Sequence, residues 1–157
     1  MKRFGLLVMF LVLMITISAV PHLSYGQSAS QKILAQRFAT TVLSIQKFCI
    51  EKAKVECELL ELTDDPPILL EGQVIDYLGV RVRGVQYIYV VLAERDDMDP
   101  DIYIFDSNGK LLASGDRTGP LDIAAHKPEY KQKVLQRIKL FKGSGRVGLA
   151  VMAPIGD

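Results

Sequence analysis

Two consecutive prolines, Pro66 and Pro67, separate two regions of this sequence that have different hydrophobic periods. Upstream, across residues 28–62, apolar residues recur at spacings of three and four, which is the period of an amphipathic helix. The members of this stripe are Leu34, Phe38, Val42, Ile45, Cys49, Ala53, Cys57 and Leu60. Proline fixes its own φ angle and disfavours helical geometry in the residue before it, so a helix must end before this pair. The sequence therefore predicts a helical segment at 27–62 and a Pro-rich linker at 63–69.

Downstream of the linker, the pattern becomes that of strands. Short runs rich in Val, Ile and Tyr are separated by turn residues, and we predict strands at 74–82, 85–93, 101–105, 111–114, 121–125 and 147–152. Turns are predicted at Arg83–Gly84, at 106–109 and at 143–145. In the second of these, Asn108–Gly109 would supply the positive φ angles that a tight hairpin needs. This arrangement predicts a mainly β chain, an antiparallel β-sandwich preceded by one long amphipathic helix.

The stretch 129–142 fits both periods. Tyr130, Val134, Ile138 and Phe141 have helical spacing, whereas every second residue from Val134 to Leu140 would share one face of a strand. A hairpin across the glycine-rich turn at 143–145 would favour the strand for the second half of the stretch.

The long helix has two interpretations, and they bear on the two cysteines. Its stripe would cover a face of the core, or it would bind a partner helix as a coiled coil, although the stripe is wider than a strict heptad seam. On one continuous helix Cys49 and Cys57 would lie about 12 Å apart, beyond the ~7 Å that a disulfide spans. We therefore expect two thiols packed as small hydrophobic groups. The alternatives are an intermolecular bridge in an oxidising compartment or, if the helix is kinked, an internal one.

The N-terminus has the features of an export signal. The basic residues Lys2 and Arg3 precede an uncharged apolar run over 4–20, and the small residues Ser24 and Gly26 stand at the −3 and −1 positions of a cleavage site. This pattern predicts a cleaved signal peptide and a secreted or periplasmic protein. The alternative is a retained N-terminal anchor, for which the apolar run is slightly short. Either way, we expect contact with a membrane only through the export segment.

The segment from Asp99 to Asp116, DPDIYIFDSNGKLLASGD, resembles the hallmark of bacterial pre-peptidase C-terminal (PPC) domains. In that family an acidic loop leads into an Asp-x-Tyr-x-x-Asp strand, an Asn-Gly turn and a Leu-x-Ala-Ser strand. The segment 143–152, GSGRVGLAVM, is similar to the final Gly-rich hairpin of the family, and the resemblance covers about 70–153. The usual Tyr-rich strand before that hairpin is replaced here by KVLQRIKLF at 133–141.

The resemblance implies a jelly-roll-like β-sandwich in an exported bacterial protein. PPC-like domains accompany secreted proteases as accessory modules, and this chain would be a free-standing version. The predicted organisation is a signal peptide at 1–26, a helical segment at 27–62, a linker at 63–69 and a PPC-like sandwich at 70–157.

Several classes of function are disfavoured by composition. The formal net charge of +1 lacks the basic excess of a dedicated nucleic-acid-binding protein. Beyond the export segment the only histidine is His126, and there is no Gly-x-Ser-x-Gly elbow, which argues against Ser-His-Asp catalysis and against zinc hydrolysis. Chemistry by paired carboxylates stays open, so a hydrolase or a hydrolase inhibitor that uses loop carboxylates is an alternative function.

The sequence contains one candidate site for a metal ion. Asp96, Asp97, Asp99 and Asp101 crowd one loop, and Asp116 is expected nearby. Hard oxygen ligands suit Ca²⁺, and extracellular calcium is abundant enough to fill weak sites. We therefore consider a weak calcium site at these five aspartates, against the alternative of a solvated loop that protects a sheet edge. No other cofactor is predicted.

Basic residues gather near the C-terminus, where only Glu129 opposes them between His126 and Arg146. They are Lys127, Lys131, Lys133, Arg137, Lys139, Lys142 and Arg146. This patch would bind an anionic lipid or polysaccharide, or it is the solvated face of a strand.

These observations predict an exported, non-enzymatic accessory or binding module whose partner is another envelope protein or a surface polymer. The alternative to a binding role is a structural subunit that oligomerises through the N-terminal helix. The residues expected to matter most are structural: Asp101, Asp106, Asn108, Gly109 and the turn from Gly143 to Gly145.

Overall fold

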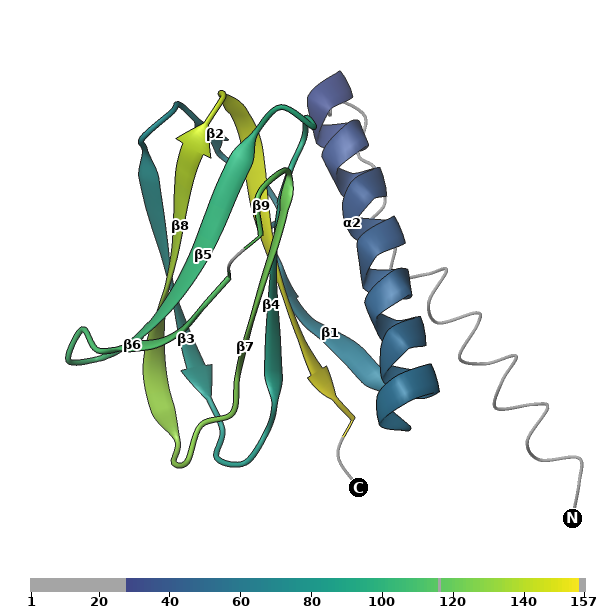
Figure 1. Ribbon diagram of the computed structural model, residues 1–157, viewed down its shortest axis with the longest axis vertical. Helices are drawn as coiled ribbons and strands as arrows, with labels where there is room; N and C mark the ends of the chain where they lie inside the picture. The colour runs from purple at the N-terminus through teal and green to yellow at the C-terminus, as the bar shows by residue number, and fades with distance from the viewer. Residues whose placement is uncertain (1–27, 116, 156–157) are drawn as a thin grey trace, which may run out of the picture.

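The computed structural model describes residues 28–115 and 117–155, which form three layers. Helix α2 (Ala29–Phe48) continues into one π-helical turn, η1 (Cys49–Ala53). One β-sheet lies next to α2, and a second sheet lies on the other side of the first, as Figure 1 shows. The predicted signal peptide at 1–26 lies outside the described residues.

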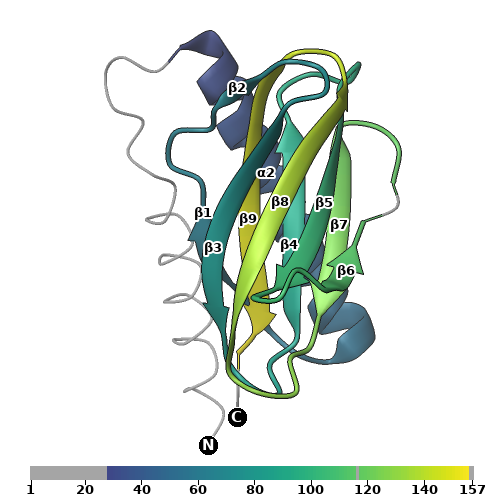
Figure 2. The same ribbon diagram turned by 90° about the vertical axis from the view of Figure 1, so that its left-hand side faces the viewer.

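The sheets are built from nine strands: β1 (Cys57–Leu62), β2 (Ile68–Leu69), β3 (Val74–Arg81), β4 (Tyr87–Ala93), β5 (Asp99–Asp106), β6 (Leu111–Ser114), β7 (Leu121–His126), β8 (Gln132–Lys142) and β9 (Gly145–Pro154). The inner sheet, next to α2, has the order β1-β9-β4-β7, with β2 also pairing with β9. The outer sheet has the order β3-β8-β5-β6 and faces the viewer in Figure 2. All pairs are antiparallel, and successive strands mostly alternate between the sheets, as in a jelly roll. The predicted fold class is confirmed.

The helix begins as the sequence predicts but ends earlier. Ser28 caps its N-terminus in a reciprocal capping box with Gln31. The prediction of helix through 62 is wrong, because Lys54 adopts a left-handed conformation (φ 59°) that ends the helical path, and β1 follows. In β1, Cys57 pairs with Pro154 of β9, so long-range ladder hydrogen bonds replace the local helical ones.

The ambiguous stretch is a strand. β8 pairs with β3 on one side and β5 on the other, and its residues Val134, Gln136, Ile138 and Leu140 are buried at alternate positions. The expected hairpin across 143–145 is wrong, because β8 belongs to the outer sheet and β9 to the inner one. The turn therefore crosses between the sheets rather than joining paired strands.

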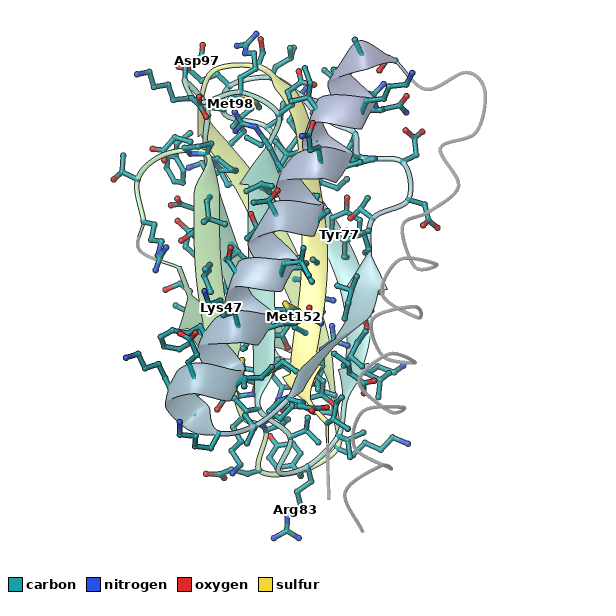
Figure 3. All side chains as sticks on the ribbon, turned by 90° about the vertical axis from the view of Figure 1, so that its right-hand side faces the viewer. Lys47, Tyr77, Arg83, Asp97, Met98 and Met152 are labelled. Atoms are coloured by element: carbon teal, nitrogen blue, oxygen red, sulfur yellow. The ribbon has the colours of Figure 1, made fainter. Side chains whose placement is uncertain are left out.

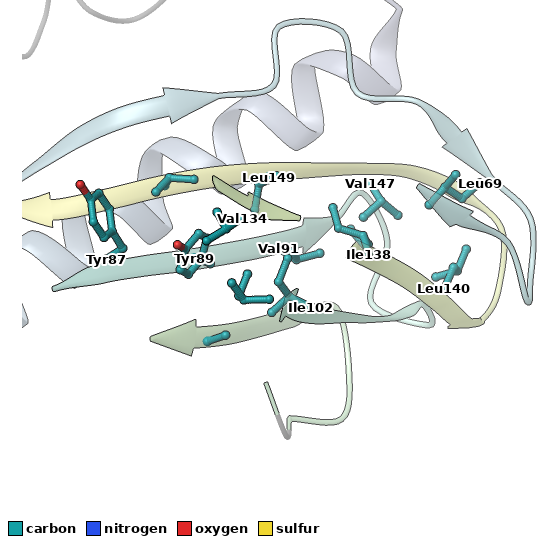
Figure 4. Packing of buried hydrophobic residues seen from close by; sticks show 14 of the residues in the cluster. Leu69, Tyr87, Tyr89, Val91, Ile102, Val134, Ile138, Leu140, Val147 and Leu149 are labelled. Atoms are coloured by element: carbon teal, nitrogen blue, oxygen red, sulfur yellow. The ribbon is translucent and has the colours of Figure 1, made fainter. Parts of the chain in front are cut away.

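The main core lies between the two sheets and is drawn in Figure 4. Fully buried members include Tyr89, Val91, Ile102, Ile104, Ile138, Leu140, Val147 and Val151. Each such aliphatic side chain contributes about 1.5–3 kcal/mol by burial. These residues come from both sheets, so the core depends on the sheets packing face to face.

A second core joins α2 to the inner sheet. Leu34 and Phe38 pack on Val90 and Leu92 of β4 and on Ala150 of β9. For the part of the stripe that is helical, the structure thus favours the interpretation in which the stripe covers a face of the core. Among the described residues, the inner sheet is therefore covered on both faces, by α2 and by the outer sheet, whereas the outer sheet is covered on one.

Candidate functional site

The first two aspartates of the predicted calcium site belong to exposed ion pairs. The Asp96 carboxylate lies 2.6 Å from the guanidinium of Arg37 on α2, and Asp97 lies 3.0 Å from Arg95. Both carboxylates project from the loop between β4 and β5, where Asp97 is labelled in Figure 3. Exposed pairs of this kind contribute little to stability.

The remaining aspartates are held separately. Asp99 accepts a hydrogen bond of 2.7 Å from the amide of Gly119, and Asp101 accepts one of 3.0 Å from the Tyr103 hydroxyl. Partial burial raises the pKa of Asp101. Asp116 lies outside the described residues. Within 28–115 and 117–155, no group of three His, Cys, Asp or Glu side chains is arranged to hold a metal ion, so calcium stays a prediction.

The most deeply buried carboxylate is one that the sequence interpretation missed. Asp122 on β7 is fully buried and accepts hydrogen bonds from the amides of Ile102 (3.0 Å), Arg117 (3.2 Å) and Ile123 (2.9 Å). Gly115 lies so close that a Cβ there would overlap this carboxylate. Asp122 therefore ties β7 to β5 and closes one side of the sandwich. The sequence does contain a signal for this role, because Asp122 stands at an inward-facing position of the predicted strand 121–125.

The opposite side of the sandwich is closed by a buried cation. Arg81 on β3 is 2% exposed, and its guanidinium contacts both carboxylate oxygens of Glu61 on β1, at 2.7 and 3.0 Å. It also donates to the Tyr89 hydroxyl and lies over the Tyr87 and Tyr89 rings. Burial alone would lower the pKa of Arg81, but Glu61 and Tyr89 hold it above its usual value. This cluster joins the two edge strands and has a structural role.

The turn between β5 and β6 is held by one side chain. Asp106 Oδ1 accepts hydrogen bonds from the amides of Asn108 (2.8 Å) and Lys110 (2.9 Å). Gly109 has a φ of 81°, whereas Asn108 does not have a positive φ, so only one of the two expected left-handed residues is present. The structural role expected of these residues is confirmed.

The glycine turn at 143–145 also has a structural role. Gly143 and Gly145 have φ angles of 83° and 154°, and a Cβ on either would lie 3.0 Å from Met98 side-chain atoms. A Cβ on Gly145 would additionally meet the Glu94 carboxylate. The turn is therefore restricted to glycine both by its backbone angles and by the side chains below it.

His126 lies at the end of β7, where its Nε2 is 2.9 Å from the Gln132 side-chain amide. Burial lowers the pKa of this imidazole, which favours its neutral form. Among the described residues, the side chain that contacts the His126 ring is thus an amide and not a carboxylate or a hydroxyl. This contact does not support the hydrolase alternative.

The predicted basic patch is divided by the fold. Lys133, Arg137 and Lys139 alternate along β8 and project from the outer face of the outer sheet. Arg146 belongs elsewhere, because it donates to the carbonyl of Pro66 at 2.6 Å and to Ser30 at the start of α2. It fastens the linker and the helix to β9.

Apolar side chains surround the three cations on the outer sheet. On the edge strand β3, Leu78 is 81% exposed, and Val74 and Val80 are also exposed. In the ladder, Leu78 stands beside Leu135 of β8, which in turn stands beside Phe105 of β5. We call this exposed surface of β3, β8 and β5 the outer-sheet face.

Acidic residues neutralise only part of the outer-sheet face. Asp76 forms a two-pronged pair with Arg137 at 2.8 Å, and this pair lowers the pKa of Asp76. Asp101 stands beside Lys139 in the ladder. Lys133 takes part in no ion pair among the described residues. The face therefore combines apolar area with a small excess of positive charge.

A shallow hollow of about 370 Å³ lies beside α2 and is lined by Ile33, Gln36, Arg37, Thr40, Thr41 and Leu92. Its lining mixes polar and apolar groups without a cluster of titratable side chains. Arg37, its only charged member, is already paired with Asp96.

Comparison with known proteins adds no family. No protein-family model matches the chain, and no curated protein matches it. The resemblance to PPC domains therefore rests on the sequence motif. In the part of the chain that the structure covers, no helix has the length and apolar character of a membrane span.

Proposed function

We propose that this chain is an exported, non-enzymatic binding module that uses its outer-sheet face to hold an acidic partner protein of the bacterial envelope. The observation that carries the proposal is the asymmetry of the sandwich. α2 covers the outside of the inner sheet, whereas the outside of the outer sheet exposes apolar and basic side chains together. A module that only stabilised itself would gain from polar residues at positions such as Leu78.

The chemistry of the face favours a protein partner. Leu78, Val80 and Val74 offer apolar area on an edge strand of eight residues that pairs with β8 without a bulge. Such an edge can also accept an extended segment of a partner as an additional strand. Lys133 and Lys139 would pair with acidic side chains of that segment, which gives the encounter charge complementarity. The predicted export signal and the resemblance to PPC accessory domains both favour an envelope protein as the partner.

The proposal is tested by capturing partners from envelope extract with the mature chain, residues 27–157, immobilised by its C-terminus. Two variants alter the outer-sheet face, Leu78→Asp and the double substitution Lys133→Glu/Lys139→Glu. The matched control reverses two exposed charges on the helical layer, Lys32→Glu/Lys52→Glu. We expect to capture one protein whose affinity for the wild type and for the control is at least tenfold higher than its affinity for either variant of the outer-sheet face.

Two further probes separate the alternatives. Binding of phosphatidylglycerol vesicles or of an anionic polysaccharide, with no protein captured, would replace the proposed partner with a lipid or polymer. Equal capture by all variants would show that the outer-sheet face is not the binding site. Hydrolytic turnover in a generic substrate screen, lost in Asp99→Ala/Asp101→Ala, would show that the chain is an enzyme. Calcium and chelator arms of the same capture test whether the acidic loop takes part.

A further inference from the structure

The early end of the helix changes the relation between the two cysteines of the chain. On a continuous helix they would be far apart, but the left-handed Lys54 turns the chain between them. The amide of Val55 then bonds back to the carbonyl of Cys49, and β1 starts at Cys57. The chain thus leaves α2, reverses, and returns as β1 beside the last turns of the helix (Figure 1).

Both thiols are buried in one small cluster. Cys49 is 4% exposed and Cys57 is 5% exposed, and the two pack with Met152 of β9. Met152 lies under the C-terminal end of α2, as Figure 3 shows. Nearby, the Gln46 side chain donates to the carbonyl of Cys57 at 3.0 Å, which fastens the start of β1 to the helix. Both thiols therefore lie in one buried cluster between the end of α2 and the inner sheet.

We propose that Cys49 and Cys57 are a redox pair that forms an intramolecular disulfide, which locks the end of α2 to the inner sheet. The structure shows the reduced form, in which both thiols are free. The oxidant would be a compound that contains a disulfide, of the kind found in oxidising compartments. The pair needs no movement of the β-sandwich, because both residues already belong to the same cluster.

The reaction proceeds in two exchange steps. One cysteine thiolate attacks the oxidant's disulfide, forms a mixed disulfide and releases one oxidant thiolate. The second cysteine, after losing its proton, attacks the mixed disulfide, so that the Cys49–Cys57 bond forms and the second oxidant thiol leaves. Two electrons and two protons leave the pair, and the oxidant becomes a dithiol.

Burial determines when the reaction takes place. Burial, together with a hydrogen bond that the Cys57 thiol donates to Cys49, raises the pKa of Cys57 well above its usual value. Because the thiolate is the reactive form, we expect the folded reduced protein to react slowly with an oxidant and the unfolded protein to react faster. The reduced native protein is therefore expected to resist alkylation until it is unfolded.

The test uses residues 27–157 refolded in a mixture of oxidised and reduced glutathione, then unfolded in the presence of an alkylating agent and weighed by mass spectrometry. The expected wild-type product is a monomer that takes up no alkyl group before reduction and two after it. Cys49→Ser and Cys57→Ser variants should each take up one. Oxidation should raise the melting temperature by roughly 5–10 °C relative to the reduced wild type.

Two outcomes would overturn the proposal. One is uptake of two alkyl groups by the refolded wild type without reduction, and the other is a disulfide-linked dimer in place of the monomer. A Cys49→Ser/Cys57→Ser variant, checked by circular dichroism, shows whether loss of the thiols alone prevents folding. Because the refolding test is done outside the cell, its result is independent of whether the chain is exported or binds an envelope protein.

Discussion

The buried carboxylate of Asp122 gives a quantitative test of how the sandwich is held closed. Asp122→Ala removes the acceptor of three amide hydrogen bonds of 2.9–3.2 Å at a residue with 0% exposure. The amide of Ile102 is buried, so water cannot replace the carboxylate there, and an unsatisfied donor costs about 1–3 kcal/mol. The other two amides are partly buried and lose about 0.5–1.5 kcal/mol each. We expect the free energy of unfolding to fall by about 2–6 kcal/mol.

The assay is urea unfolding of residues 27–157 followed by circular dichroism, because the chain contains no tryptophan. Asp99→Ala is the matched control. Asp99, the first residue of β5, accepts a single amide bond from Gly119 at a partly buried site. Its loss should lower the free energy of unfolding by about 1 kcal/mol. The dependence of the unfolding free energy on urea should keep its slope in both variants.

The comparison has a clear contrary outcome. If Asp122→Ala loses less than about 1 kcal/mol, the three hydrogen bonds do not hold the edge of the sandwich. If Asp99→Ala loses as much as Asp122→Ala, burial is not what distinguishes the two carboxylates. Either result would contradict the structural account of β7.

Three further predictions concern pH, packing and the end of the helix. Because burial lowers the pKa of His126, the imidazole takes up a proton more readily in the unfolded chain, so stability falls as pH drops below about 6.5. In His126→Gln the free energy of unfolding should therefore change less between about pH 7 and pH 5 than in the wild type. An equal pH dependence in the two proteins would contradict this prediction. Gly148→Ala should lower stability by about 1–3 kcal/mol in urea unfolding, because the new Cβ would lie 2.7 Å from the Phe38 ring; a neutral effect would show that α2 does not rest there. Lys54→Gly should raise stability by about 0.5–1 kcal/mol by relieving its left-handed backbone, and a loss would mean that the Lys54 side chain contributes more than its backbone costs.

Local sequence signals were reliable where local physics decides the conformation. The capping box of Ser28 and Gln31 starts the helix, and Gly109 permits the turn that Asp106 holds. Alternating β-branched residues likewise mark strands, since one side of each strand must face an apolar interior. The fold class and most strand positions could therefore be predicted.

Tertiary structure decided what local signals leave undetermined. The period of residues 54–62 fits a helix, yet the ladder between β1 and β9 makes the last part of it a strand. The glycine turn at 143–145 fits a hairpin, yet the jelly-roll order sends its two strands into different sheets. In both cases the partner strand is remote in sequence, so no local pattern identifies it.

The candidate sites divide in the same way. The sequence identified the exposed acidic loop and the basic residues of β8 because charge is visible in composition. It could not show that Asp122 accepts three amides, or that Cys49 and Cys57 share a cluster, since these relations exist only once α2 and the two sheets have packed. Composition and period indicate where the helix starts and where most strands lie, but the contacts between distant segments determine which side chains meet, because only packing removes them from water together.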